Sequence, residues 1–83
     1  MAQREKLLKR FLEKPKDLTW DEFVAVLGYF GFRCESGKGS RRAFIHKDSG
    51  AVLFFHEPHP RNTVLVCYVR QAIGYLKESG LLK

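Results

Sequence analysis

Residues 41–56 read RRAFIHKDSGAVLFFH, and this stretch decides the fold. Aromatic and β-branched residues lie on both sides of Lys47-Asp48-Ser49-Gly50, a run of turn formers. Such a pattern predicts two antiparallel strands, residues 41–46 and 51–56, joined by a four-residue turn. Pro58 and Pro60 end the second strand, because proline cannot donate to a sheet ladder.

The turn length also predicts the strand register. It pairs His46 with Ala51 and Arg41 with His56, and it places alternate residues on opposite faces of the hairpin. One face is apolar and suits a core: it holds Phe44, Leu53 and Phe55. The other face holds Arg41, Ala43, Ile45, Val52, Phe54 and His56. If helices cover only the first face, the apolar part of the second is exposed and fits a protein partner.

Helices are predicted on both sides of this hairpin. Apolar residues at helical spacing predict an amphipathic helix over residues 4–14, which ends before Pro15. Thr19 and Glu22 form a capping box for a second helix that reaches about Phe30, with Gly31 as its stop. A first strand over residues 32–35 and a last helix over residues 66–79, followed by Gly80, complete the pattern.

The resulting order is helix, helix, three strands, helix. It predicts an α+β fold in which helices cover one face of a three-stranded antiparallel sheet. We expect residues 1–18 to be an N-terminal helical extension and residues 19–83 to form the main domain.

Length and composition limit the possible functions. The chain has 83 residues, 45% of them hydrophobic and 29% charged, which fits one globular domain and excludes a two-domain enzyme with a deep enclosed pocket. No apolar run is long enough for a membrane span, and the charged N-terminus does not resemble a signal peptide, so we expect a cytoplasmic protein. Cys34 and Cys67 have no metal-ligand or disulfide spacing and are predicted to be reduced, partly buried thiols.

The positive charge is concentrated around one hairpin. Fifteen Lys and Arg against nine Asp and Glu leave a net charge of +6, and residues 37–47 contain four bases and no acid before Asp48. A compact basic patch favours a polyanionic partner, most often nucleic acid. Gly37-Lys38-Gly39-Ser40 lacks the spacing of a P-loop, but its backbone N–H groups and Lys38 suit a phosphate; the alternative is a flexible turn.

Histidines gather directly after the third strand, in His56-Glu57-Pro58-His59-Pro60. An imidazole held between prolines suits acid–base chemistry, phosphate binding or metal ligation; the alternative is that both are surface residues of a turn. A metal site is not expected because no third ligand is placed near them, and His46 is expected to be structural or solvated. His56 beside Arg41 has the groups for RNA backbone cleavage, which needs a base, an acid and a cation but no metal or cofactor.

Three segments together resemble the HicA toxin family of bacterial type II toxin–antitoxin systems. They are Gly39–His46, Phe55–Pro60 and Val69–Ile73 with its continuation to Leu81, and the resemblance spans residues 19–81. It implies a fold like that of double-stranded RNA-binding domains. It also implies a cytosolic messenger-RNA endoribonuclease that halts growth, and a HicB antitoxin that covers its active surface.

One position departs from the family pattern. The family has Gly-Ser-His, with the histidine in catalysis, whereas this chain has Gly39-Ser40-Arg41. Either the catalytic histidine has moved to the third strand, as His56, or to the residues after it, as His59, or the chain binds RNA or antitoxin with little cleavage. A double-stranded RNA-binding module is less favoured, because the apolar start of the last helix lacks the lysines that such a module needs.

The cleavage hypothesis gives each residue a role. His59 and His56 are the candidate acid and base, and Arg41 stabilises the phosphate. The candidate RNA contacts are Lys38, Ser40, Arg42 and Arg61. The candidate interface for the antitoxin, or for a second copy of the chain, is Ala43, Ile45, Val52 and Phe54.

Overall fold

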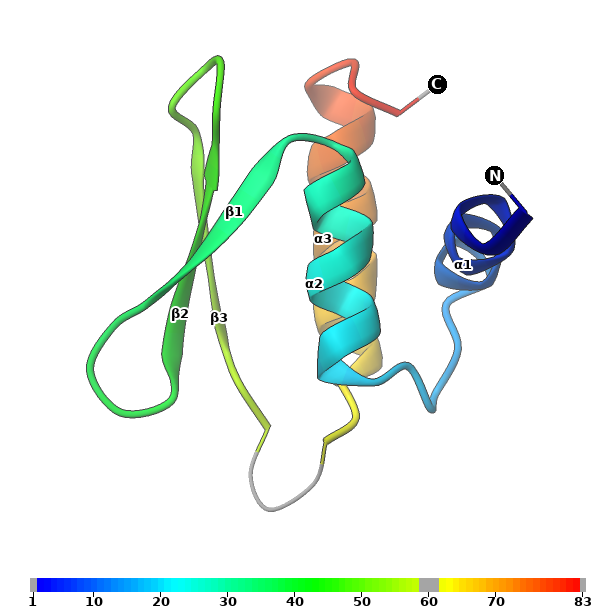
Figure 1. The fold of residues 1–83 in the computed structure, drawn as a ribbon, viewed down its shortest axis with the longest axis horizontal. Helices are drawn as coiled ribbons and strands as arrows, with labels where there is room; N and C mark the ends of the chain where they lie inside the picture. The colour runs from blue at the N-terminus through cyan, green and yellow to red at the C-terminus, as the bar shows by residue number, and fades with distance from the viewer. Residues whose placement is uncertain (1, 59–61, 83) are drawn as a thin grey trace.

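The structure is a computed structural model and describes residues 2–58 and 62–82. The elements are α1 (Ala2–Leu12), α2 (Trp20–Tyr29), β1 (Phe32–Ser36), β2 (Arg41–His46), β3 (Val52–His56) and α3 (Val66–Glu78). Figure 1 shows the sheet on one side, α2 and α3 in the middle, and α1 beyond them. The predicted α+β fold is confirmed. None of the described helices has the length and apolar character needed to cross a membrane.

The sheet has the predicted topology and register. Its strand order is β1-β2-β3, and both neighbouring pairs are antiparallel. Arg41 pairs with His56 and Phe44 with Leu53, as the four-residue turn requires. The N–H of His46 donates to the carbonyl of Ala51 at 2.8 Å, which closes the hairpin. The two faces predicted from the sequence are therefore the two faces of the structure.

Aromatic rings join the sheet to α2. The Phe23 ring of α2 packs edge-on against Phe55 and Phe44, with centroids 5.1 and 5.7 Å apart, and the two sheet rings lie 5.7 Å from each other. All three side chains are almost fully buried. Edge-to-face pairs of this kind contribute about 0.5–1.5 kcal/mol each beyond the burial of their area. This cluster holds the inner face of the sheet against the helices.

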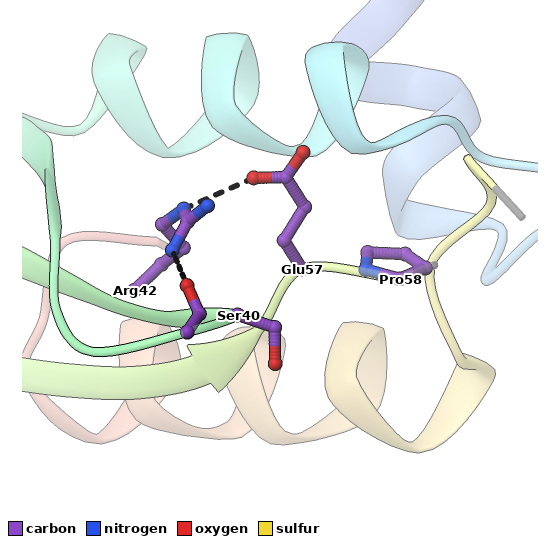
Figure 2. Close-up of a pocket in the computed structure, with 5 residues that line it drawn as sticks. Ser40, Arg42, Glu57 and Pro58 are labelled. Atoms are coloured by element: carbon purple, nitrogen blue, oxygen red, sulfur yellow. Dashed lines mark hydrogen bonds and ion pairs between the residues drawn. The ribbon is translucent and has the colours of Figure 1, made fainter. Parts of the chain in front are cut away.

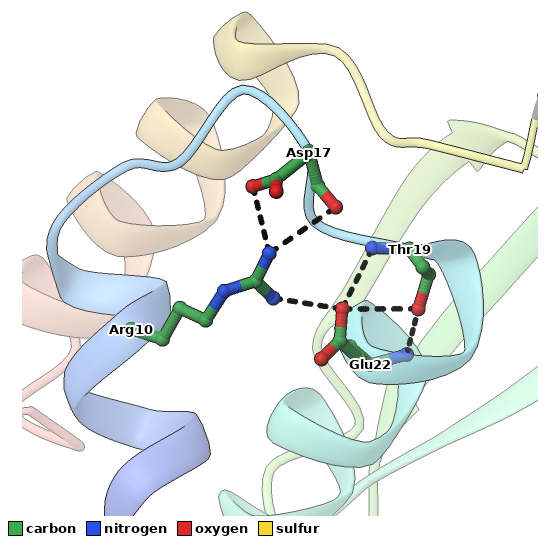
Figure 3. A network of polar contacts seen from close by, with 4 residues as sticks. All are labelled: Arg10, Asp17, Thr19 and Glu22. Carbon is green, nitrogen blue, oxygen red and sulfur yellow. Dashed lines mark hydrogen bonds and ion pairs between the residues drawn. The ribbon is translucent and has the colours of Figure 1, made fainter.

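The start of α2 carries the predicted capping box and one further residue. The Glu22 carboxylate accepts from the Thr19 N–H at 3.0 Å, and the Glu22 N–H donates to Thr19 Oγ1 at 3.2 Å. Arg10 of α1 donates to the same carboxylate at 2.8 Å and pairs with Asp17 at 2.7 Å (Figure 3). The Thr19 backbone hydrogen bond, with the Arg10 hydrogen bond, lowers the pKa of Glu22.

Helix α1 begins and ends two residues earlier than the predicted range of residues 4–14. Lys14 has φ of +55° and directly precedes Pro15, a position where proline disfavours helical backbone. Phe11 is fully buried in the common core, whereas the neighbouring Leu12 is 37% exposed. The predicted boundary between an N-terminal extension, residues 1–18, and the main domain, residues 19–83, stays a prediction.

His46 is a structural residue. Its side chain is 6% exposed, and its Nδ1 accepts from the backbone N–H groups of Asp48 and Ser49 at 3.2 Å. Nε2 then carries the proton and donates to the Phe30 carbonyl at 3.0 Å. Gly31 stands beside it with φ of +93°, and a Cβ there would lie 3.0 Å from Nε2. The predicted glycine stop of α2 thus also makes room for the imidazole.

The segment that leads into α3 is tied to the entrance of α2. The Trp20 N–H donates to the Asn62 carbonyl, and the Val64 N–H donates to the Leu18 carbonyl, both at 2.7 Å. Thr19 and Thr63 form an antiparallel bridge between these two bonds. The helix itself starts at Val66, and its N-cap residue Leu65 makes no side-chain capping hydrogen bond. Backbone pairing with residues 18–20 therefore determines where α3 begins.

Glu22→Gln tests the capping box. We expect it to lower the free energy of unfolding at neutral pH by about 1 kcal/mol, because the group that accepts from Arg10, the Thr19 N–H and the Thr19 hydroxyl loses its charge. A carboxyl whose folded pKa is depressed stabilises the protein above its unfolded pKa, and this contribution disappears as the pH falls through the folded pKa. Urea titrations should therefore show a gap between wild type and variant that closes in acid. Glu13→Gln, which removes an exposed carboxylate, should show no such gap.

Phe11→Ala tests whether α1 belongs to the folding unit. Because Phe11 is fully buried, its truncation should lower the free energy of unfolding by about 3–5 kcal/mol. The neighbouring Leu12→Ala removes an exposed side chain and should cost well under half as much. Equal costs in urea denaturation would contradict the placement of α1 in the core.

Candidate functional site

The turn between β1 and β2 is fixed by backbone hydrogen bonds. The Gly37 N–H donates to the Arg41 carbonyl at 2.7 Å, and the Arg41 N–H donates to the Lys38 carbonyl at 3.1 Å. Gly39 has φ of +59°, which glycine adopts without strain. The Glu57 N–H donates to the Ser40 carbonyl at 2.8 Å, so the turn is attached to the end of β3. This attachment brings two predicted site segments together.

Ser40, Arg41 and His56 lie together at this junction. Ser40 Oγ and His56 Nδ1 share a hydrogen bond of 3.2 Å, and both side chains are exposed. Arg41 is the direct cross-strand partner of His56, so their side chains leave the same face of the sheet. The sequence predicted the Arg41–His56 pairing. It did not predict the Ser40–His56 hydrogen bond, which depends on how the turn folds back.

The Arg41 side chain lies on an aromatic ring. Its guanidinium carbon is 4.4 Å from the centroid of the Phe54 ring. This is a cation–π contact, and it holds the charge over the outer face of the sheet. Phe54 is 52% exposed despite the contact.

Arg42 lies on the opposite face and is already paired. Its Nε donates to the Glu57 carboxylate at 3.0 Å, and one terminal nitrogen donates to the Gly39 carbonyl at 2.9 Å (Figure 2). The same nitrogen also donates to the Arg41 carbonyl at 2.9 Å. The Arg42 side chain is only 20% exposed. These contacts favour a positioning role for Arg42, while its role as an RNA contact stays a prediction. Sequence reasoning missed Glu57 as a site residue. The available signal was its position, because it is the first acid after the third strand and that strand ends beside the basic turn.

An open pocket lies beside this ion pair. It has a volume of about 470 Å³ and is lined by Gly39, Ser40, Arg42, Glu57 and Pro58 (Figure 2). Both the turn and the end of β3 contribute to it, so its shape depends on the hydrogen bond that joins them.

The remaining predicted residues divide into three groups. Lys38 is exposed on the turn. His59 and Arg61 lie outside the described residues. Of the predicted interface, Val52 and Phe54 are 44% and 52% exposed, while Ala43 and Ile45 are half-buried.

The cysteines do not contribute a reactive group to this junction. Both are free; Cys34 is half-buried as predicted, but Cys67 is exposed and the prediction of partial burial was wrong for it. Burial raises the pKa of the Cys34 thiol, which leaves little thiolate at neutral pH. Among the described residues, no three His, Cys, Asp or Glu side chains are grouped so that they could hold a metal ion.

The site is thus a basic hairpin with a Ser–His pair on a small α+β domain. Residues 20–81 match the family model of the HicA toxin of bacterial toxin–antitoxin systems, which covers most of the chain. This chain therefore belongs to the HicA toxin family. Searches of curated proteins and of solved structures found no match.

Arg42→Ala should loosen the junction. It removes three hydrogen bonds that hold residues 39–41 and the Glu57 carboxylate in place. Amide hydrogen exchange at Gly37, Arg41 and Glu57 should become faster, while the amides of α2 keep their protection. Arg33→Ala is the control, because it breaks a similar ion pair with Glu35 at an exposed position of β1. Unchanged exchange in the Arg42 variant would remove the positioning role.

Proposed function

We propose that this chain is the toxin of a toxin–antitoxin pair and acts as a metal-independent endoribonuclease on messenger RNA in the cytoplasm, so that translation and growth stop. Membership of the HicA toxin family supports the toxin role. The observation that carries the nuclease role is the Ser40–His56 hydrogen bond at 3.2 Å with Arg41 opposite. This arrangement places the His56 imidazole and the Arg41 guanidinium together on the exposed surface.

Backbone cleavage of RNA needs three groups. A base takes the proton of the 2′-hydroxyl, which attacks phosphorus, and an acid protonates the leaving 5′ oxygen. A cation stabilises the charge that develops on the phosphate oxygens. In our proposal His56 and His59 divide the first two tasks, and Arg41 performs the third.

Ser40 gives His56 a defined orientation. Since Nδ1 is held by the hydroxyl, Nε2 is the ring nitrogen left to exchange a proton with RNA. In the neutral ring whose Nδ1–H donates to Ser40 Oγ, Nε2 has a free lone pair and is the base. In the imidazolium both nitrogens carry protons, so Nδ1 still donates to Ser40 and Nε2 gives up its proton as the acid. The same pair thus serves either half of the reaction.

Binding of the RNA backbone is assigned to the positive charge around the turn. Lys38 is exposed there, Arg41 is exposed on β2, and the chain carries a net charge of +6. Ser40 lines the same turn, and Arg61 is assigned to this group from the sequence. Contacts to phosphates carry no sequence information, so we expect weak sequence preference and an affinity that falls steeply with salt.

We propose the outer face of the sheet as the surface covered by a HicB-like antitoxin or by a second copy of the chain. Val52 and Phe54 expose large apolar side chains there, with Ala43 and Ile45 between them and β1. A partner seated on this face would also cover Arg41 and His56, which share it. Neutralisation would then result from direct obstruction of the site.

A second candidate is a non-catalytic toxin-family member that binds RNA or antitoxin. The observation in its favour is Arg41, which stands where the family pattern has histidine. Arginine remains charged at physiological pH and cannot act as a base. In this case the Ser40–His56 pair would be a binding feature only.

His56→Ala distinguishes the two candidates. Loss of an acid or base slows such reactions by about 100-fold or more, so induced expression of the variant should leave growth and transcripts intact, whereas wild type arrests growth and fragments messenger RNA. His59→Ala should act in the same direction. Lys77→Ala, which removes an exposed cation on α3, should behave like wild type.

Two results would contradict the nuclease proposal. One is intact messenger RNA in cells that express wild type, which favours the non-catalytic candidate. The other is unchanged cleavage by both histidine variants, which would place the chemistry elsewhere. Melting curves of each variant confirm that an inactive protein is folded.

A further inference from the structure

We propose that Phe54 and Arg41 form a stacking platform for an unpaired base of the RNA, so that the substrate is single-stranded at the site. This inference rests on the proposed function and names its class of substrate. The platform lies on the outer face of the sheet, on the same side as His56.

The Phe54 ring is exposed by the register of the sheet. Its cross-strand partner is Ala43, whose methyl group is too small to cover it, and beyond Ala43 stands the short polar end of β1 with Glu35. Phe54 consequently remains 52% exposed, more than any other aromatic residue in the described part of the chain. Aromatic rings on an open sheet are surfaces on which bases of single-stranded nucleic acid stack.

Arg41 gives this ring the electrostatic character that RNA requires. The guanidinium sits 4.4 Å from the ring centroid and is itself exposed. A guanidinium plane stacks on a base and also attracts the phosphate beside it. A purely apolar protein partner would leave this charge without a partner, whereas a nucleotide has a base that stacks on the ring and a phosphate that pairs with the guanidinium. Charge complementarity therefore favours RNA as the occupant.

The geometry also links the platform to cleavage. Phe54 and His56 are two residues apart on β3 and point to the same face, and Arg41 is opposite His56. A base stacked on Phe54 would place its own sugar and phosphate next to these side chains. In a duplex the bases are stacked on each other and are not available to the ring. The platform thus selects RNA with an unpaired base next to the bond that is cut.

The test measures binding without cleavage. A fluorescein-labelled, single-stranded 2′-O-methyl RNA lacks the attacking hydroxyl, and its anisotropy at low salt reports affinity. Its annealed duplex and an abasic strand of equal length are the comparison probes. Phe54→Leu keeps an apolar side chain, Phe54→Trp keeps a ring, and Arg41→Lys keeps the charge but loses the plane. Arg33→Lys on the same face and Leu65→Ala, which truncates an exposed apolar side chain before α3, are the controls.

We expect Phe54→Leu and Arg41→Lys each to weaken single-strand binding about fivefold or more, since a base–aromatic stack contributes about this much. Phe54→Trp and both controls should bind like wild type. Neither loss should occur with the abasic strand, which has no base to stack. Wild type should bind the single strand more tightly than the duplex.

Wild-type affinity in Phe54→Leu, or equal losses with the abasic strand, would overturn the platform. Unchanged RNA binding together with lost binding of a HicB-like antitoxin would also overturn it and assign the face to protein. The nuclease proposal is tested separately, by the effect of His56→Ala on transcripts. Either proposal can therefore fail while the other stands.

Discussion

The inward placement of Phe44 and Phe55 is the constraint on which the rest of the structure depends. Because side chains alternate along a strand, burying these two rings against Phe23 forces the intervening residues onto the open face. Arg41 and His56 are exposed there for this reason. A shift of one residue in β2 would turn Arg41 inward and Phe44 outward, and the same shift in β3 would turn His56 inward and Phe55 outward. The core and the candidate site are consequently specified by a single register.

The two arginines at the start of β2 show how this alternation separates structural from functional charge. Arg42 faces the helices, and its guanidinium is held by Glu57 and two carbonyls, as expected for a cation that must lie near a core. Arg41 faces outward, and its guanidinium lies on a ring that is itself half exposed. The residue that gives the turn its shape and the residue available to a ligand are thus neighbours in sequence. Composition alone does not separate them.

Much of the fold could be predicted because it depends on local signals. The turn at residues 47–50, the Thr19–Glu22 box and the glycines after α2 and α3 each act within a few residues. The site was harder to predict: the Arg41–His56 pairing follows from turn length, but the Ser40–His56 bond needs a turn that folds back onto β3. Likewise, nothing in the sequence near Arg10 indicates that it reaches the cap of α2, twelve residues away. Such contacts between distant segments depend on packing, which periodicity does not report.

Helix α1 lies outside the segment that matches the family, yet its Phe11 is fully buried in the common core. Figure 1 places this helix beyond α2 and α3, away from the outer face of the sheet. Stability contributed there acts on the unfolded fraction, the form that cellular proteases degrade. Substitutions in α1 can thus change how long each molecule survives without changing the outer face of the sheet, which we propose for RNA and antitoxin. For the toxin role that we propose, in which a partner neutralises the protein, lifetime and activity are then adjusted at separate places in the chain.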